Sequence, residues 1–144
     1  MIHFSAPENF TPKFEVAGCF VECDDRILLL KRHPHKPEGG TWCGPSGKLD
    51  GHETADAAII RETKEETGLD LDPARLEHVK KIFVVYPGYQ FVYHIFRIPL
   101  SGAGEVAINP REHTEYKWVT PREALGMELI QDEDACVKLT YGIE

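Results

Sequence analysis

The sequence predicts an α+β protein in which a mixed β-sheet lies between helices, an α/β/α sandwich. Two strand-like segments precede one long helical segment, a strand hairpin follows that helix, and a last short strand leads into a final helix. Each face of a sheet needs an apolar partner, so helices in the middle and at the end of the chain can cover the two faces.

Length and composition are those of a globular protein. The chain has 144 residues, of which 42% are hydrophobic and 10% aromatic, and we expect one domain over residues 1–144. No apolar run reaches the length of a membrane span and the N-terminus lacks a signal pattern, so we expect a cytoplasmic monomer or homodimer without membrane contact. The four cysteines have no C-x-x-C spacing, which favours buried free thiols over a zinc site.

Acidic residues are concentrated in one stretch of the chain. The formal net charge is −8, and residues 47–72 contain eight acidic and only three basic residues. An acidic protein repels polyanions, which argues against a nucleic acid polymer as partner. A small phosphate-bearing molecule that arrives with its metal ion fits this charge better.

Two strands are expected before the long helix. Residues 13–23 alternate apolar and polar side chains, Asp24-Asp25 is a turn signal, and residues 26–33 form a continuously apolar strand. The second strand ends in a basic run, residues 31–36, in which Lys36 and two histidines are expected to be solvated. Trp42 follows a Gly-Gly loop and is expected to pack at the sheet edge.

The long helix is expected between Thr54 and Gly68, where neither Gly nor Pro interrupts the chain and Gly68 suits a left-handed cap. Its apolar side chains recur at Ala55, Ala58 and Ile59. At about 100° per residue, the same stripe continues to Glu62 and Glu66, with Glu65 beside them. The face that packs inward at the start of the helix therefore carries carboxylates at its end.

Carboxylates at that position need a partner. Like charges four residues apart cost about 0.2–0.5 kcal/mol, and carboxylates placed toward a core cost more. A hard divalent cation such as Mg²⁺ or Mn²⁺ takes oxygen ligands and binds phosphates. The alternative is a solvated acidic helix with an Arg61–Glu65 ion pair.

The remaining elements follow in order. Residues 80–86 and 89–98 are expected to form a hairpin around Pro87-Gly88, with aromatic side chains that alternate between a core and a possible cleft. Residues 101–111 are punctuated by Gly and Pro and are expected to form a loop, followed by a strand at residues 115–120. Thr120-Pro121-Arg122-Glu123 is typical of a capping box, and residues 131–139 of a last helix.

The acidic stretch resembles a known signature. Gly47 is followed after five residues by Glu53 and after seven more by Arg61-Glu62-Thr63-Lys64-Glu65-Glu66-Thr67-Gly68-Leu69. This 23-residue pattern resembles the box of the Nudix hydrolases at every Gly, Glu and Arg position. Thr63 stands where an aliphatic residue is usual, and Ser46 where a glycine is usual.

The resemblance implies the roles of individual residues. Glu62 and Glu66 would be the principal metal ligands, joined by Glu65 and the Gly47 carbonyl, and would hold one to three Mg²⁺ (or Mn²⁺) ions. Arg61 would orient the cluster through Glu53. The catalytic base would be a box glutamate or a later glutamate, with Glu112 the first outside candidate and Glu115 the second. The candidate substrate-binding residues are the basic side chains Arg32 and Lys48.

The function implied is metal-dependent hydrolysis of the diphosphate in a nucleoside diphosphate linked to another group. A nucleoside triphosphate is the favoured substrate, and ADP-ribose, a dinucleoside polyphosphate or a nucleotide sugar remains open. Two other functions compete with it: a non-catalytic nucleotide sensor, and an acidic interaction domain without metal.

Overall fold

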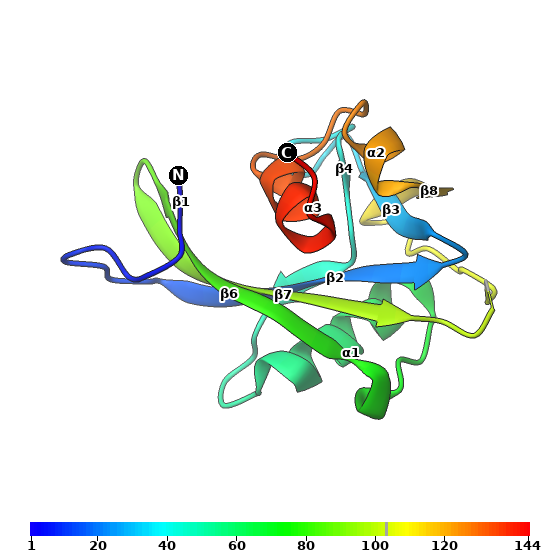
Figure 1. The fold of residues 1–144 in the computed structure, drawn as a ribbon, viewed down its shortest axis with the longest axis horizontal. Helices are drawn as coiled ribbons and strands as arrows, with labels where there is room; N and C mark the ends of the chain where they lie inside the picture. Colours follow the sequence, from blue (N-terminus) through cyan, green and yellow to red (C-terminus); the bar gives the residue numbers. More distant parts are fainter. Residues whose placement is uncertain (103) are drawn as a thin grey trace.

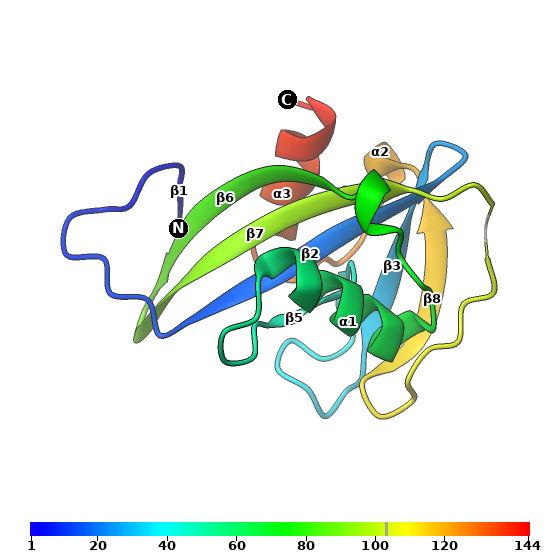
Figure 2. The ribbon, with the colours of Figure 1, turned by 90° about the horizontal axis from the view of Figure 1, so that it is seen from below.

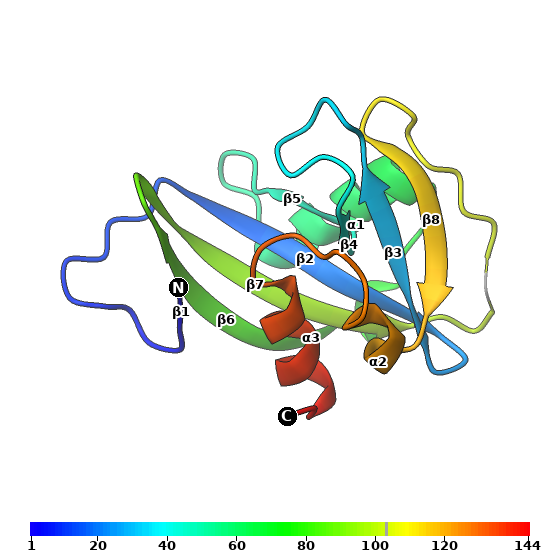
Figure 3. The same cartoon turned by 90° about the horizontal axis from the view of Figure 1, so that it is seen from above.

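The computed structural model describes residues 1–102 and 104–144, and it shows a mixed sheet with helices on both faces (Figure 1). The long helix α1 (Ala55–Thr67) covers one face, seen from below in Figure 2. The short helix α2 (Pro121–Ala124) and α3 (Glu133–Tyr141) cover the other face, seen from above in Figure 3. The α/β/α sandwich predicted from the order of the elements is confirmed.

The sheet is mixed because one of its central pairs is parallel. Its strands are β1 (Ile2–His3), β2 (Phe14–Cys23), β3 (Arg26–Arg32), β4 (Trp42–Cys43), β5 (Ser46–Lys48), β6 (Glu77–Tyr86), β7 (Tyr89–Pro99) and β8 (His113–Val119). The order is β1-β6-β7-β2-β3-β4, with β5 added to β2 and β8 to β3. β2 and β7 run parallel, whereas the other pairs are antiparallel.

Two turns lie where their sequence signals predict them. Asp24 and Asp25 join β2 to β3 with φ of 49° and 64°, the left-handed conformation that tight hairpins require. Gly88 has φ of 90° in the turn between β6 and β7, where Tyr86 pairs with Tyr89.

Alternation along the strands divides the apolar side chains between two cores. The core under α1 includes Ala17, Cys19, Val21, Leu28, Leu30, Ala58, Ile59, Phe96 and Ile98. The core under α2 and α3 includes Phe20, Ile27, Leu29, Ile82, Val84, Ile95, Cys136 and Val137. The central strands are buried on both faces because adjacent residues contribute to opposite cores.

The ends of α1 are fixed by its neighbours in sequence. The Thr54 side chain accepts from the Ala57 amide at 3.2 Å, and Gly68 ends the helix with φ of 76°. The buried stripe differs from the expectation in one respect. It continues from Ile59 through Thr63 to Glu66, while Glu62 lies at its edge, half-buried.

Other expectations are met with small shifts of boundary. Thr120 and Glu123 form both bonds of the capping box at the start of α2. All four cysteines are free and buried. The strands β1, β4 and β5 and the 3-10 turn Pro73–Arg75 were not expected, because two or three residues carry no periodic pattern. The loop at residues 101–111 is present, with residue 103 outside the described residues.

No helix in the described part of the chain has the length and apolar character needed to span a bilayer.

Candidate active site

The site begins where β5 lies against α1. Gly47 pairs with Ala17 of β2, and this register brings the Gly47 backbone against the carboxyl group of Glu62. A Cβ at position 47 would overlap that carboxyl group, so only glycine permits the approach. The first glycine and the second glutamate of the box are therefore in direct contact.

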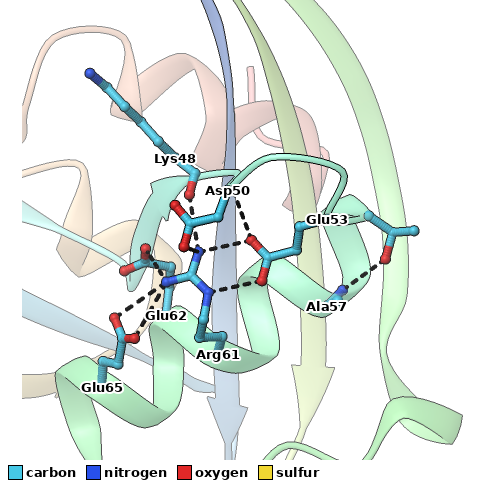
Figure 4. Close-up of polar contacts among 8 residues, drawn as sticks. Lys48, Asp50, Glu53, Ala57, Arg61, Glu62 and Glu65 are labelled. Carbon is cyan, nitrogen blue, oxygen red and sulfur yellow. Dashed lines mark hydrogen bonds and ion pairs between the residues drawn. The ribbon is translucent and has the colours of Figure 1, made fainter.

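Arg61 joins the loop before α1 to the acidic face of the helix (Figure 4). Its Nε and Nη2 donate to the two Glu53 oxygens at 2.8 and 2.9 Å, a bidentate pair. Its Nη1 donates to Glu62 Oε1 at 2.9 Å and lies 3.4 Å from both Glu65 oxygens. Nη2 also donates to the Lys48 carbonyl at 3.1 Å, which connects the same guanidinium to β5.

These contacts fix the charge of both partners. Hydrogen bonds from Arg61 lower the pKa of Glu53 to about 2, and the bonds to Glu53 raise the pKa of Arg61 above its usual value. Glu53 is therefore ionised and committed to Arg61 across the physiological range. The bond expected between Arg61 and Glu53 is present, and its role is to hold the loop against the helix.

Glu62 and Glu66 differ from Glu53 because burial dominates their environment. Glu66 is 4% exposed, and its Oε1 accepts from the Ser46 amide at 3.3 Å. Burial raises the pKa of Glu66 well above its usual value, and the neighbouring Glu62 raises it further. Burial also raises the pKa of Glu62, although Arg61 acts in the opposite direction. Two adjacent carboxyl groups thus compete for one proton or one cation.

Glu65 lies apart from this pair. Its side chain is 55% exposed and is directed to Arg61 rather than to Gly47. Of the three carboxylates that the helix was expected to bring together, the structure places two beside Gly47 and one at the rim.

A cavity of about 440 Å³ opens above Glu62 and Glu66. Its charged lining residues are Arg32, Lys36, Lys48, Glu62, Glu66 and Glu112. Carboxylates on α1 and basic side chains from β3, β5 and the loop after β3 therefore face one space. Such an arrangement suits a phosphate chain that is bound together with a cation.

Two lining residues were missed by the sequence reasoning. Lys36 is exposed, as expected, and it also lines the cavity. His113 begins β8 and is 4% exposed; burial, together with Arg32 and Lys36, lowers its pKa to about 4. It lies before the strand that was expected at residues 115–120 and gave no signal, because the β3–β8 pairing alone brings it to the site.

The structure distinguishes between the two candidates for the catalytic base that lie outside the box. Glu112 lines the cavity, and its charge contributes to the raised pKa of Glu66. Its backbone is fixed by a 2.8 Å bond from the His33 amide to the Glu112 carbonyl. Glu115 instead pairs with Lys31 at 3.4 Å and does not line the cavity.

A hard divalent cation fits the donors beside Gly47. Glu66 is a buried carboxyl group with an amide as its hydrogen-bond donor, and Glu62 adjoins it. Across the described chain, no three Asp, Glu, His or Cys side chains are already arranged as a closed metal cluster. The Gly47 carbonyl, expected as a further ligand, is instead directed toward β2, because the Cys19–Pro45 and Glu15–Leu49 bonds on either side make Ala17–Gly47 a hydrogen-bonded pair of the antiparallel ladder. The two carboxylates form the open, oxygen-rich set that Mg²⁺ accepts while it keeps water ligands.

A smaller pocket of about 140 Å³ lies on the α3 face of the sheet. Its aromatic lining residues are Tyr86, Tyr89, Phe91 and Tyr93. Two acidic residues at the start of α3 complete it: Asp132, which accepts from the Tyr86 hydroxyl at 2.7 Å, and the buried Glu133. The alternating aromatics of the hairpin thus form the wall of a pocket as well as a core.

The segment between β3 and β4 contributes to both spaces. Lys36 lines the cavity and Glu38 lines the aromatic pocket. Arg32 Nε donates to the Pro37 carbonyl at 2.8 Å, and the Gln131 amide donates to Glu38 Oε1 at 2.8 Å. These bonds hold residues 33–41 as a wall shared by the two hollows.

Another hollow, of about 500 Å³, lies at the β2–β3 turn. Its Glu22 is already paired with Arg97 at 3.1 Å and accepts from Tyr141. Glu22 and Arg97 are therefore already paired with each other in this hollow.

Comparison with known proteins identifies the pattern independently. The NUDIX domain model matches residues 12–138. A MutT-like protein from Streptomyces ambofaciens is 32% identical over 127 residues, covering 85% of this chain and 76% of that protein. The crystal structure of a MutT NUDIX hydrolase from Burkholderia pseudomallei superimposes with a TM-score of 0.77 at 26% identity, covering 90% of this chain and 98% of that one.

Two further relatives carry more specific names. A putative 8-oxo-dGTP diphosphatase 3 from Mycobacterium tuberculosis is 31% identical over 72% of this chain, and an ADP-ribose pyrophosphatase from Methanocaldococcus jannaschii is 39% identical over 52% of it. The matches cover 48% and 40% of those proteins, so the chain spans less than half the length of each.

Proposed function

Because the chain belongs to the NUDIX domain family, we propose that it is a pyrophosphohydrolase that cleaves a phosphoanhydride bond in a nucleoside diphosphate linked to a second group. The observation that carries this proposal is the adjacent pair of the half-buried Glu62 and the buried Glu66, which faces a cavity with three basic side chains. Carboxylates for a cation and bases for phosphate oxygens are the two requirements of phosphoanhydride hydrolysis.

Glu62 and Glu66 would hold the proposed cofactor, Mg²⁺ or Mn²⁺, with Glu65 as a further ligand from the rim. When bound, the cation neutralises phosphate charge and makes a water molecule more acidic. The protein's own cations, Arg32, Lys36 and Lys48, bind the phosphate oxygens that remain and orient the chain of phosphates. Arg61 and Glu53 keep the loop and the helix in register.

Glu112 is the proposed proton acceptor for the attacking water. It lies in the cavity with the ligands, and its backbone is anchored to the end of β3. A box glutamate, Glu62 or Glu65, is the alternative. Glu62 is less suited because it already accepts from Arg61 at 2.9 Å and adjoins Gly47.

The proposed substrate is a nucleoside triphosphate. The aromatic pocket has polar acidic groups at one end, which suits a nucleobase that stacks on a ring and forms hydrogen bonds at its edge. Lys36 and Glu38, two residues apart in one segment, line the phosphate cavity and this pocket respectively. ADP-ribose is the second candidate, because relatives with both kinds of name match the chain.

A substrate panel tests the proposal. Nucleoside triphosphates, 8-oxo-dGTP, ADP-ribose, a dinucleoside tetraphosphate and a nucleotide sugar are incubated with Mg²⁺, and the products are separated by chromatography. We expect a triphosphate to give a monophosphate and pyrophosphate. Hydrolysis of ADP-ribose alone would replace the favoured substrate with the second candidate.

The Glu66→Gln variant is the matched control for each compound. Loss of turnover together with retained nucleotide binding, measured by calorimetry, would support the catalytic role of the site. A wild-type protein that binds nucleotides but hydrolyses none would make it a sensor, and one without any Mg²⁺-dependent change in Tm would contradict both nucleotide functions.

A further inference from the structure

Glu133 is a buried carboxylate outside the set of candidate ligands. It is the first residue of α3, and its side chain is directed into the protein, with 4% of the residue exposed. Burial raises its pKa to about 7. Its Oε2 accepts from the Gly44 amide at 3.0 Å. Gly44 is three residues before Gly47, so this bond is made to the segment that carries the metal-site glycine.

The Glu133 side chain replaces a missing backbone bond in the hydrogen-bond ladder between the segment that starts at Trp42 and residues 128–130. The Trp42 amide donates to the Glu128 carbonyl at 2.8 Å, and the Ile130 amide donates to the Trp42 carbonyl at 3.0 Å. A third bond of this parallel ladder would join Gly44 to Ile130. The Ile130 carbonyl instead accepts from the Glu133 amide at 3.1 Å, and the Gly44 amide is left to the carboxylate.

The segment is held from three directions. The Cys19 amide donates to the Pro45 carbonyl at 3.0 Å, and the ideal Cβ position at Gly44 lies 2.6 Å from the Cys19 carbonyl oxygen. The Ser46 amide donates to Glu66 at 3.3 Å. Two buried carboxylates, one on α3 and one on α1, therefore bind amides two residues apart in one stretch of chain.

We propose that Glu133 is a positioning residue for the reaction: by binding the Gly44 amide, it fixes residues 44–47 so that the Ser46 amide meets Glu66 and the Gly47 backbone lies against Glu62. The inference rests on the proposed function of the Glu62–Glu66 site. It assigns the start of α3, on the opposite face of the sheet, a part in building that site.

Two variants of similar size separate the hydrogen bond from simple packing. Glu133→Gln keeps an oxygen that can accept from Gly44, whereas Glu133→Met fills the same space without an acceptor. We expect Glu133→Met to bind Mn²⁺ at least 10-fold more weakly and to lose at least 10-fold in kcat. We expect Glu133→Gln to keep both within about threefold of the wild type and to change mainly KM, since Glu133 also lines the aromatic pocket.

Three readouts are taken on the wild type and both variants: Mn²⁺ affinity by electron paramagnetic resonance, kcat and KM with Mg²⁺, and amide hydrogen exchange of Ser46 and Gly47 by NMR. The exchange rates should rise in Glu133→Met and stay unchanged in Glu133→Gln. A folded Glu133→Met variant with wild-type Mn²⁺ affinity, kcat and exchange would overturn the proposal. Equal losses in both variants would also overturn it, because charge rather than the bond to Gly44 would then be responsible.

If Glu133→Met does not fold, Glu133→Asp replaces it, because the shorter side chain withdraws the oxygen from Gly44 while the charge remains. Wild-type behaviour of Glu133→Asp would then reject the proposal. Failure of the proposed function has a different signature: a wild type that neither hydrolyses the panel nor binds Mn²⁺. In that case the exchange rates of Ser46 and Gly47 still decide whether Glu133 positions the segment.

Discussion

At the scale of single residues, the site depends on carboxyl groups whose surroundings give them different charges. Glu53 is held ionised by Arg61, whereas burial makes ionisation of Glu66 costly. The Glu53–Arg61 pair organises the loop, and Glu66 is suited to bind a cation. This division of roles explains why one stretch of chain needs so many acidic side chains.

Glu66→Gln is expected to lower kcat at least 100-fold, since it removes a proposed ligand of the cation that would stabilise the transition state. The metal-free protein should have an unchanged or higher Tm, because a neutral amide is less costly to bury than a carboxylate. Steady-state kinetics and thermal melts in EDTA measure the two effects. Glu8→Gln, at an exposed position, is the control; equal kinetics in both variants would remove Glu66 from the site.

Glu112→Gln tests the proton acceptor separately from the ligands. We expect kcat to fall by roughly 10²–10⁴-fold while KM changes little, as for loss of a general base. The Mn²⁺ affinity should remain close to that of the wild type. Glu115→Gln, whose side chain pairs with Lys31, is the control. A change in kcat of less than a few-fold would transfer the role to a box glutamate.

At the scale of elements, α1 and β5 are fitted to each other at Gly47 and Thr63. The glycine admits the Glu62 carboxyl group, and Thr63 occupies the centre of the buried stripe with 0% of its surface exposed. Among the described residues, Thr63 Oγ1 is a buried hydroxyl without a hydrogen-bond partner. Burial of this unpaired hydroxyl therefore lowers the stability that α1 gains from packing.

Thr63→Val should stabilise the protein by about 1 kcal/mol, because it removes an unpaired buried hydroxyl at nearly constant volume. Thr67→Val is the matched contrast on the same helix. Thr67 Oγ1 donates to the Thr63 carbonyl at 2.6 Å and accepts from the Leu69 amide at 3.2 Å, so its loss should destabilise by a similar amount. Urea denaturation of both variants compares the free energies of unfolding, and a destabilised Thr63→Val would show that the hydroxyl has a partner.

Gly47→Ala is expected to lower kcat about 100-fold, since a displacement of about 1 Å at a catalytic group has an effect of that size. The added methyl group would force β5 and Glu62 apart. Gly126→Ala is the control, because a Cβ there meets only the Glu123 carbonyl at an ordinary 3.5 Å. Wild-type kinetics of Gly47→Ala would show that the contact is not needed.

At the scale of the whole molecule, stability depends on two buried titratable groups with opposite shifts. The pKa of Glu133 is raised to about 7, and that of His113 is lowered to about 4. The contribution of Glu133 to the free energy of unfolding is fully present below the ordinary glutamate pKa of about 4.3 and is lost as pH rises through 7. The His113 contribution is present above about 6.5 and is lost as pH falls toward 4.

Glu133→Gln should abolish the loss of stability that the wild type undergoes as pH rises through 7. Measured by thermal melts in EDTA, the Tm of the variant should exceed that of the wild type by more at pH 8 than at pH 5. The difference in unfolding free energy is of the order of 3 kcal/mol. A difference that stays constant across this range would show that Glu133 titrates at its ordinary pKa.

Much of the fold and part of the site follow from local sequence. The C-cap of α1 at Gly68 and the turns at Asp24-Asp25 and Gly88 were predicted because neighbours in sequence determine them. The Arg61–Glu53 bond was expected from the resemblance to the Nudix signature. Lys36 and His113 were not, since their arrival at the cavity depends on loop paths and on the pairing of β3 with β8. The stripe of α1 was predicted one step off, because periodicity does not show where the neighbouring strand lies.

The wall formed by residues 33–41 has a consequence for substrate length. In the proposed function one hollow receives the phosphates and the other the base, and hydrogen bonds that Pro37 and Glu38 accept hold their common boundary in place. In that case the length of this segment would limit how many phosphates can separate the base from the cation. An insertion here would then shift the preference toward longer polyphosphates, while every proposed cation ligand stays unaltered.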